Sequence, residues 1–434
     1  MSADSGKLVG DFVTLQRGKT YSGRLVGEPG PALLGLGSIE PGGGFRADKY
    51  KTFGGECPPS LMVAPGDIYV ALKGATKDGS MVGSVARLPR TLGAGRLTQD
   101  TARLDFVDGT GAEAVAYLYW VLRTPQYRQY CAGRLTGSAA ASFSRNDFLS
   151  YPVPPVTGAS RAIVGVLEAT EKKIDLNRQM NETLEAIARA LFKSWFVDFD
   201  PVRAKSEGRD PGLPPHLADM FPDSFEDSEL GEIPTGWRVG RFGDVAENPR
   251  RQVEPRAIDA STPYIGLEHM PRGRIALEHW GIAGGLDSGK LRFERGEILF
   301  GKLRPYFHKV GVAPIGGVCS TDIVVIRPRT DAEFGMVLGL ASSDAFVDRA
   351  SAGSTGTRMP RTNWADMARF QNVIPPAGVA AAFTDQMRPF IDRITTAIHQ
   401  SNAVVALRDS LLPALVSGSL RTWASAGDQP QGDA

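Results

Sequence analysis

The sequence has 434 residues, of which 42% are hydrophobic and 22% charged, and its formal net charge is +1. This length exceeds the usual size of one hydrophobic core, so we expect two or three domains. The composition is that of a soluble folded protein, and the lack of an apolar run of about 18 residues excludes a membrane-spanning helix. Because the N-terminus is polar and shows no signal-peptide pattern, we expect a cytoplasmic protein.

Cysteine spacing and charge distribution narrow the class further. Cys57, Cys131 and Cys319 lie far apart and form no Cys-x-x-Cys pair, which argues against a disulfide framework or a zinc site. Lys and Arg outnumber Asp and Glu by 17 to 13 in residues 1–157 and by 19 to 15 in residues 233–376, whereas the remaining segments are acidic. This alternation indicates two basic units that can face phosphates, joined by parts that face protein or solvent.

Residues 1–157 predict a mixed α/β domain. Short β-rich runs such as DIYVAL (67–72) alternate with turns rich in Gly and Pro, and a helix is expected at 111–130. The domain closes with a small-residue loop, TGSAAASFSRNDF, and a short strand that ends in prolines.

Residues 158–199 predict one long helix. Its seam positions recur at spacings of three and four from Ile163 to Trp195, with Asn177 and Asn181 in a polar middle section. A helix that packs on a globular core usually shows a wider apolar stripe, so this narrow seam favours pairing with a second helix.

The candidate partner helix is residues 377–420, which resemble the first long helix at an offset of 220 residues. Pro389 and Pro413 fall inside it, so we expect a kink or a break there. Residues 200–232, rich in Pro and acidic side chains, predict a connector, and residues 421–434 predict a disordered tail.

Residues 233–376 repeat the plan of the first domain. LGSIEPGGG (36–44) corresponds to IGLEHMPRG (265–273), and PGDIYVALK (65–73) corresponds to RGEILFGKL (295–303). A domain followed by a long helix therefore occurs twice, which predicts an internal repeat with pseudo-twofold symmetry.

Catalytic motifs are incomplete. The segment GGLDSGKL at 284–291 has the spacing of a phosphate-binding loop, but it ends in Leu where Ser or Thr would hold magnesium, and it leads into a strand pattern. Asp67 with Lys73, and Glu297 with Lys302, lack the second acidic residue of a nuclease metal site. Because the five histidines show no ligand spacing either, we expect a non-catalytic chain without a metal site.

Two loop types offer recognition chemistry: a basic-aromatic turn, GKLRPYFHKVG, and a loop rich in Ser, Thr and Arg. Hydroxyls and backbone N–H groups can donate to phosphate oxygens, and Arg can donate twice to guanine. Solvated polar turns are the alternative, but recurrence at the same place in both repeats favours DNA contact. The candidate DNA-binding residues are Lys73, Lys77, Arg134, Ser138, Ser142 and Arg145 in the first repeat, and Lys302, Arg304, Tyr306, Lys309, Ser354, Thr355, Thr357, Arg358 and Arg361 in the second.

The centre of the chain carries a family resemblance. ETLEAIARALFKSWFVDFDPVRAK (182–205), followed by LGEIPTGW (230–237), resembles the middle of the specificity subunits of type I restriction-modification systems. The resemblance extends over nearly the whole chain, because such subunits hold two target-recognition domains separated by two long helices. It implies an α+β fold with two antiparallel coiled-coil-like helices, in which each domain reads one half of a split DNA target and the helix pair sets the spacer.

The resemblance also implies partners. Double-stranded DNA would be bound together with two DNA methyltransferase subunits, which bring S-adenosylmethionine, and with restriction/translocase subunits, which use ATP and magnesium; this chain itself would hold no cofactor and contact no membrane. Phe192, Trp195 and Phe196 carry more aromatic surface than one partner helix needs, so they are candidate partner-binding residues. The alternatives are a related bipartite system whose methyltransferase is fused to a nuclease, a stand-alone enzyme, and a coiled-coil scaffold that does not bind DNA.

Overall fold

The chain forms two compact units of mixed helix and strand. Unit 1 comprises residues 1–173 and 404–434, and unit 2 comprises residues 174–403. Each unit holds one repeat together with part of both long helices, so the predicted α+β class with two long helices is confirmed. The computed structural model describes residues 6–47, 49–74, 79–137, 140–354 and 359–417.

Unit 1 contains two four-stranded sheets. Their strands are β1 Val13–Arg17, β2 Ala32–Leu34, β3 Lys51–Thr52, β4 Met62–Val63, β5 Ile68–Ala71, β6 Val85–Arg87, β7 Gly95–Leu97 and β8 Thr101–Phe106. The first sheet has the order β1-β8-β5-β6 and is antiparallel, and the second has the order β3-β2-β7-β4 with β2 and β7 parallel. All four residues of β5, IYVA, are buried, as expected for an apolar strand inside a covered sheet.

Two helices, α1 Ala112–Val121 and α2 Pro125–Ala132, replace the single helix predicted for residues 111–130. The chain leaves the helical conformation because Pro125 disfavours it at Thr124, whose ψ is 154°. The Thr124 hydroxyl instead caps α2 by accepting a backbone N–H from its first turn at 3.4 Å. The prediction of one continuous helix was therefore wrong. A third short helix, α3 Arg145–Leu149, follows the small-residue loop.

Unit 2 repeats both sheets in the same strand order. Its strands are β12 Ala246–Glu247, β13 Gln252–Val253, β14 Pro263–Ile265, β15 Gly281–Ile282, β16 Lys290–Phe293, β17 Ile298–Gly301, β18 Val310–Val312, β19 Gly317–Cys319 and β20 Ile323–Pro328. The order β12-β20-β17-β18 matches β1-β8-β5-β6. Read from its other edge, the second sheet has the order β15-β14-β19-β16-β13. Its first four strands match β3-β2-β7-β4, including the parallel pair β14 and β19, and β13 is added at the edge beside β16. The predicted duplication is confirmed in topology.

Short elements complete unit 2. The predicted connector is folded into two helices and a hairpin: α5 Asp200–Ser206, α6 Pro215–Ala218, β9 Phe225–Ser228 and β10 Gly231–Pro234. The repeat itself adds α7 Phe242–Val245, α8 Phe334–Ala341, α9 Asp344–Ala352, α10 Trp364–Ala368 and the antiparallel pair β11 Arg238–Arg241 and β21 Gln371–Ile374. Helices α8, α9 and α10 occupy the chain positions of α1, α2 and α3 in unit 1.

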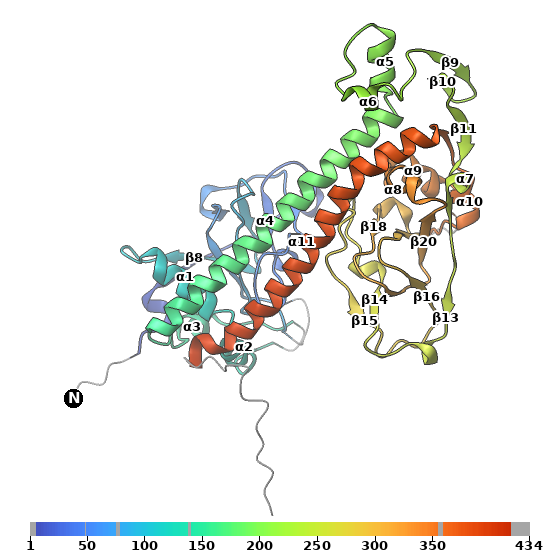
Figure 1. Ribbon diagram of the computed structural model, residues 1–434. Coiled ribbons are helices and arrows are strands. Elements are labelled where there is room, and N and C mark those ends of the chain that lie inside the picture. The colour runs from blue at the N-terminus through green and yellow to red at the C-terminus, as the bar shows by residue number, and fades with distance from the viewer. Residues whose placement is uncertain (1–5, 48, 75–78, 138–139, 355–358, 418–434) are drawn as a thin grey trace, which may run out of the picture. The chain divides into compact units, whose positions relative to one another are not determined.

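The two long helices are α4, Gly158–Phe196, and α11, Ala377–Ser417. Within unit 2 they lie side by side and antiparallel (Figure 1). Near the end of α4, the ring of Phe192 lies 6.3 Å from that of Phe383, near the start of α11. Earlier in α4, Asn177 Nδ2 donates to the Ala397 carbonyl, later in α11, at 3.2 Å. Asn177 is buried in the seam, where a polar group with a specific partner fixes the register of a helix pair.

Helix α11 continues through Pro389 and Pro413. Each proline removes one backbone N–H and leaves the carbonyl four residues earlier, at Asp385 or Asp409, without its helical donor. All four residues are exposed, so water can satisfy these carbonyls. The predicted break is therefore absent.

A charged network attaches the first turns of α4 to the rest of unit 1. Arg87 on β6 forms a bidentate pair with Glu168, with distances of 2.8 and 2.9 Å from its two terminal nitrogens to the two carboxylate oxygens. Trp120 Nε1 also donates to Glu168, at 2.7 Å. One turn further along the helix, Glu171 accepts from Arg123 at 2.9 Å. Planar, two-point pairing of this kind fixes orientation as well as distance.

The surroundings of Glu168 favour its ionised form. Burial alone raises the pKa of this carboxyl, but the hydrogen bonds from Arg87 and Trp120 and the charge of Arg87 outweigh burial and hold the pKa of Glu168 below its usual value. The network therefore stabilises unit 1 when Glu168 is ionised. This stability is present above the usual pKa of a Glu carboxyl and is lost as the pH falls through the lowered pKa.

Replacement of Arg87 by Met tests this attachment. Arg87→Met should lower the free energy of unfolding by about 1.5–3 kcal/mol at neutral pH, because a hydrogen-bonded charge loses its partner. The difference from the parent should shrink in acid, where Glu168 is protonated, and denaturant unfolding at several pH values measures it. Arg161→Met is the matched control, since Arg161 pairs with Glu113 on the surface and should contribute little. Equal stability of Arg87→Met and the parent at neutral pH would contradict the assignment.

Candidate nucleic-acid interface

The two predicted loop types of the second repeat lie against each other. Leu303 and Arg361 form an antiparallel bridge between the basic-aromatic turn and the Ser/Thr/Arg loop. Arg304 N–H donates to the Pro360 carbonyl at 2.7 Å, and Thr362 N–H donates to the Lys302 carbonyl at 3.1 Å. Two segments about 55 residues apart in the sequence thus form one surface.

The corresponding segments of the first repeat are joined in the same way. Lys73 and Ser142 form an antiparallel bridge, Gly74 N–H donates to the Ala141 carbonyl at 2.8 Å, and Phe143 N–H donates to the Leu72 carbonyl at 2.9 Å. We call each joined pair a loop pair: residues 72–74 with 141–143 in unit 1, and residues 302–304 with 360–362 in unit 2. The sequence placed the members of each pair in separate groups, and the structure brings them together twice.

The turn from Arg304 to His308 is the most constrained part of the unit 2 loop pair. Arg304 and His308 both have left-handed backbone conformations, with φ of 51° and 49°, on either side of a single 3-10 turn that starts at Pro305. Such conformations cost about 1 kcal/mol or more for a side-chain-bearing residue, so surrounding contacts must hold them. The turn presents Tyr306, whose side chain is 55% exposed.

Other candidates of the second repeat are already engaged within the chain. Lys309 Nζ donates to the Leu267 carbonyl at 2.5 Å, and Arg361 Nε donates to Asp322 at 3.0 Å, although the Arg361 side chain stays about half exposed. Ser354 Oγ donates to the Ser351 carbonyl at 2.6 Å. For two further candidates of the second repeat, Lys302 and Tyr306, the contacts among the described residues include no side-chain hydrogen bond.

In the first repeat, three candidates lie at the surface. Lys73 is exposed on the loop pair, and Arg145 is exposed in the first turn of α3. Arg134 is exposed and stacks its guanidinium on the Tyr130 ring at 3.7 Å from the ring centre. The Ser142 hydroxyl lies 3.1 Å from that of Thr136. The remaining candidates, Lys77, Ser138, Thr355, Thr357 and Arg358, lie outside the described residues.

The aromatic residues at the end of α4 are covered by the chain's own side chains. Trp195 is 2% exposed and lies 5.0 Å from Phe221 and 5.3 Å from Phe383, measured between ring centres. Phe196 packs edge-on against Phe383, and a Cβ on Gly339 of α8 would lie 2.1 Å from the Phe192 ring. The other long helix accounts for part of this contact, and binding of these rings to a methyltransferase subunit stays a prediction.

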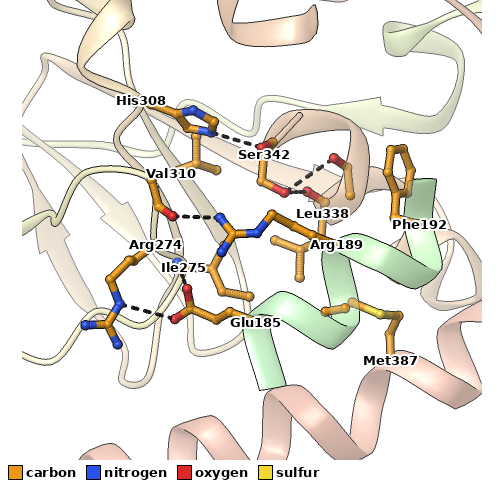
Figure 2. Close-up of a pocket in the computed structure, with 13 residues that line it drawn as sticks. Glu185, Arg189, Phe192, Arg274, Ile275, His308, Val310, Leu338, Ser342 and Met387 are labelled. Carbon is orange, nitrogen blue, oxygen red and sulfur yellow. Dashed lines mark hydrogen bonds and ion pairs between the residues drawn. The ribbon is translucent and has the colours of Figure 1, made fainter. Parts of the chain in front are cut away.

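Sequence reasoning missed a polar contact between α4 and the second repeat. Figure 2 shows Glu185 and Arg189, four residues apart on α4, reaching toward the segment of Arg274 and Ile275 beside a small cavity. The volume of this cavity, about 30 Å³, suits only one or two water molecules. On a helix, Glu and Arg at this spacing usually pair on the surface, so nothing in the sequence distinguished these two.

The described residues offer little to other classes of site. No group of three or more His, Cys, Asp or Glu side chains among them could hold a metal ion, and none of the helices they form is long and apolar enough to cross a membrane. Burial raises the pKa of the Cys319 thiol to about 12, which makes this cysteine unreactive.

No protein-family model matches the chain, but several known proteins are similar to it. The chain is 24% identical over 326 residues to the type I restriction enzyme MjaIX specificity subunit of Methanocaldococcus jannaschii, covering 72% of this chain and 70% of that one. It is 22% identical over 315 residues to the EcoDI specificity subunit of Escherichia coli, covering 70% and 69%. The HindI specificity subunit of Haemophilus influenzae is 39% identical over 98 residues, 22% of this chain and 21% of that one.

A solved structure has a similar fold. The S subunit of a type I restriction-modification system from M. genitalium matches with a TM-score of 0.53 over 96% of this chain and 97% of that one, at 11% sequence identity. At this identity the match concerns the fold alone.

Replacement of Trp195 by Ala tests whether the aromatic cluster is a core. Trp195→Ala should lower the free energy of unfolding by about 3–5 kcal/mol, because a large buried ring leaves a cavity. Denaturant unfolding measures the change, and Val197→Ala, at an exposed neighbouring position, is the control that should change stability little. A loss in Trp195→Ala no larger than in the control would mean that the ring is not part of the core.

Proposed function

From its homology to the specificity subunits of type I restriction enzymes, we propose that this chain recognises a bipartite DNA sequence and lends that specificity to catalytic partner subunits. Each repeat reads one half of the target through its loop pair. The observation that carries the proposal is the recurrence of the loop pair, joined by equivalent backbone contacts, in two repeats of the same topology. Recognition of a single, undivided DNA site would not require two such loop pairs.

The chemistry of the loop pairs suits DNA. Lys73, at the centre of residues 72–74, and Lys302, the first of residues 302–304, are exposed or partly exposed cations that can neutralise phosphates. Arg304 and Arg361 offer the donors that recognise guanine in the major groove. Phosphate contacts would position the repeat on the duplex, and base contacts would supply sequence information.

The long helices are proposed to set the spacing between half-sites. Helix α4 has 39 residues, which at 1.5 Å per residue is about 58 Å. One turn of DNA, the distance between half-sites read from one face, is about 34–36 Å. A helix of this length can therefore span more than one turn.

Catalysis is assigned to partners. We propose that two methyltransferase subunits supply S-adenosylmethionine and the methyl transfer, and that restriction/translocase subunits supply ATP-dependent cleavage with magnesium. The chain would hold none of these cofactors. Copurification of the chain with its partners, and identification of a separate or a fused nuclease, distinguishes this system from the related bipartite type.

Exchange of one repeat tests independent reading. Replacement of residues 233–376 by the matching domain of a relative should change one half of the recognised sequence and leave the other half and the spacer unchanged. Methylation-aware sequencing of DNA modified by the assembled complex measures the outcome. A change in both halves would contradict independent reading, and the unexchanged complex is the control.

Salt titration tests the division between phosphate and base contacts. Lys302→Ala, assembled with the methyltransferase subunits, should bind all sequences more weakly and reduce the slope of log affinity against log salt by about one unit. Arg304→Ala should instead lose about 1–3 kcal/mol of discrimination at one position of one half-site. Lys193→Ala is the control, because Lys193 pairs with Asp198 at the end of α4. If both loop variants bind cognate and mismatched duplexes as the parent does, the loop pair does not contact DNA.

A further inference from the structure

Helix α4 holds a backbone segment of the second repeat by side chains alone. Glu185 accepts the N–H groups of Ile275 and Ala276 at 3.2 and 3.1 Å, one on each carboxylate oxygen. Arg189, one turn along, donates to the Gly273 carbonyl at 2.8 Å. Figure 2 shows both side chains pointing from α4 toward this segment. We call Glu185 and Arg189 the α4 clamp.

The segment that the clamp holds, residues 273–276, is hydrogen-bonded to the end of the Arg304–His308 turn and to the strand that follows it. We call it the clamped segment. Gly273 N–H donates to the His308 carbonyl at 2.8 Å, and Val312 N–H donates to the Ile275 carbonyl at 3.0 Å. Gly273 therefore meets the clamp through its carbonyl and the turn through its N–H. Arg189, Gly273 and His308 are thus joined in one chain of hydrogen bonds that runs from α4 to the last residue of the turn.

A second contact couples the same segment to the aromatic part of the turn. The Arg272 guanidinium lies 3.9 Å from the centre of the Phe307 ring, and Phe307 packs edge-on against Tyr306 at 4.8 Å. On the other side, His308 Nε2–H donates to the Ser342 carbonyl at 2.9 Å. The turn thus depends on residues 272–273 for both its backbone and its ring positions.

The burial of the Glu185 carboxylate is unusual for a residue that would only pack α4 against the second repeat. Its side chain is 2% exposed, and the nearest cation, Arg274, is 3.9 Å away, too far for a direct hydrogen bond. Burial raises the pKa of this carboxyl, and the two backbone N–H groups and Arg274 only partly oppose it. A buried carboxylate costs stability unless it is satisfied, whereas an apolar residue could dock a helix without this cost.

We propose that Glu185 and Arg189 are positioning residues that hold the Arg304–His308 turn, through Gly273, in the orientation that reads DNA. The inference rests on the proposed function of the loop pair. It assigns to α4 a part in base discrimination by the second repeat in addition to its part in spacing. The strained backbone at Arg304 and His308 is then the consequence of presenting Tyr306 from a fixed turn.

The test compares Arg189→Met and Glu185→Gln with the parent, each assembled with the methyltransferase subunits. Binding is titrated against the cognate duplex and against duplexes with single mismatches in either half-site. Loss of one hydrogen bond from the clamp should reduce discrimination in the half-site of the second repeat about three- to tenfold, with discrimination in the other half-site unchanged. Exchange of residues 233–376 identifies which half-site this is.

Two further variants separate positioning from a general loss of structure. Lys193→Met, on the same helix but outside the clamp, should keep full discrimination. Gly273→Ala should reduce it as the clamp variants do, because Gly273 has φ of +62° and a Cβ there meets nothing within 4 Å, so only the backbone is strained. Glu185→Gln keeps one acceptor oxygen and leaves the other backbone N–H without an acceptor, so its melting temperature is measured beside its discrimination. The loss of discrimination should be confined to one half-site, whereas a general loss of structure would affect both.

The outcomes distinguish a failure of the positioning role from a failure of the proposed function. Parent-like discrimination by both clamp variants would overturn the positioning role, as would an equal loss in both half-sites. A parent complex that shows no sequence preference would instead refute the proposed function itself.

Discussion

Each repeat depends on a carboxylate of α4, which is partly buried in Glu168 and buried in Glu185. In unit 1, Glu168 is held by the side chains of Arg87 and Trp120, and these contacts lower its pKa. In unit 2, Glu185 is held mainly by two backbone N–H groups, and burial raises its pKa. Removal of a carboxylate from water is costly, so each must find partners in one geometry only. The same helix therefore fixes each repeat by a directional contact that apolar packing alone would not give.

The two repeats keep their topology and differ in how they present a recognition surface. Both sheets recur in the same strand order, and both loop pairs are joined by equivalent backbone hydrogen bonds. In the second repeat the loop pair continues into a proline-started turn with two left-handed residues and an exposed tyrosine, whereas the sequence GATKD at 74–78 of the first repeat has neither a proline nor a tyrosine. A conserved framework with a variable turn is a physical basis for two half-sites of different sequence, because backbone pairing does not depend on the side chains it displays.

Sequence periodicity predicted the features that are local or repeated. The long helices, the duplication and the polar seam at Asn177 follow from spacing, and the helix break at Thr124 could have been predicted from Pro125 alone. The joining of Leu303 to Arg361 could not be, since it is a contact between distant segments. The inward direction of Lys309 and the covering of Trp195 by Phe221 could not be predicted either. The sequence pattern of a cation in a turn, or of an aromatic residue on a helix, does not depend on whether the side chain faces solvent or the protein.

The two attachments to α4 constrain sequence differently. The network around Glu168 requires particular side chains, Arg87 and Trp120, from the first repeat. The α4 clamp binds Gly273, Ile275 and Ala276 through their backbone groups, which almost any residue with the right conformation supplies. A foreign second domain can therefore meet Glu185 and Arg189 without matching side chains at positions 275 and 276, provided that its backbone follows the same path, which at Gly273 has φ of +62° and favours glycine. A foreign first domain must carry the arginine and the tryptophan, or bring its own first turns of α4 with it.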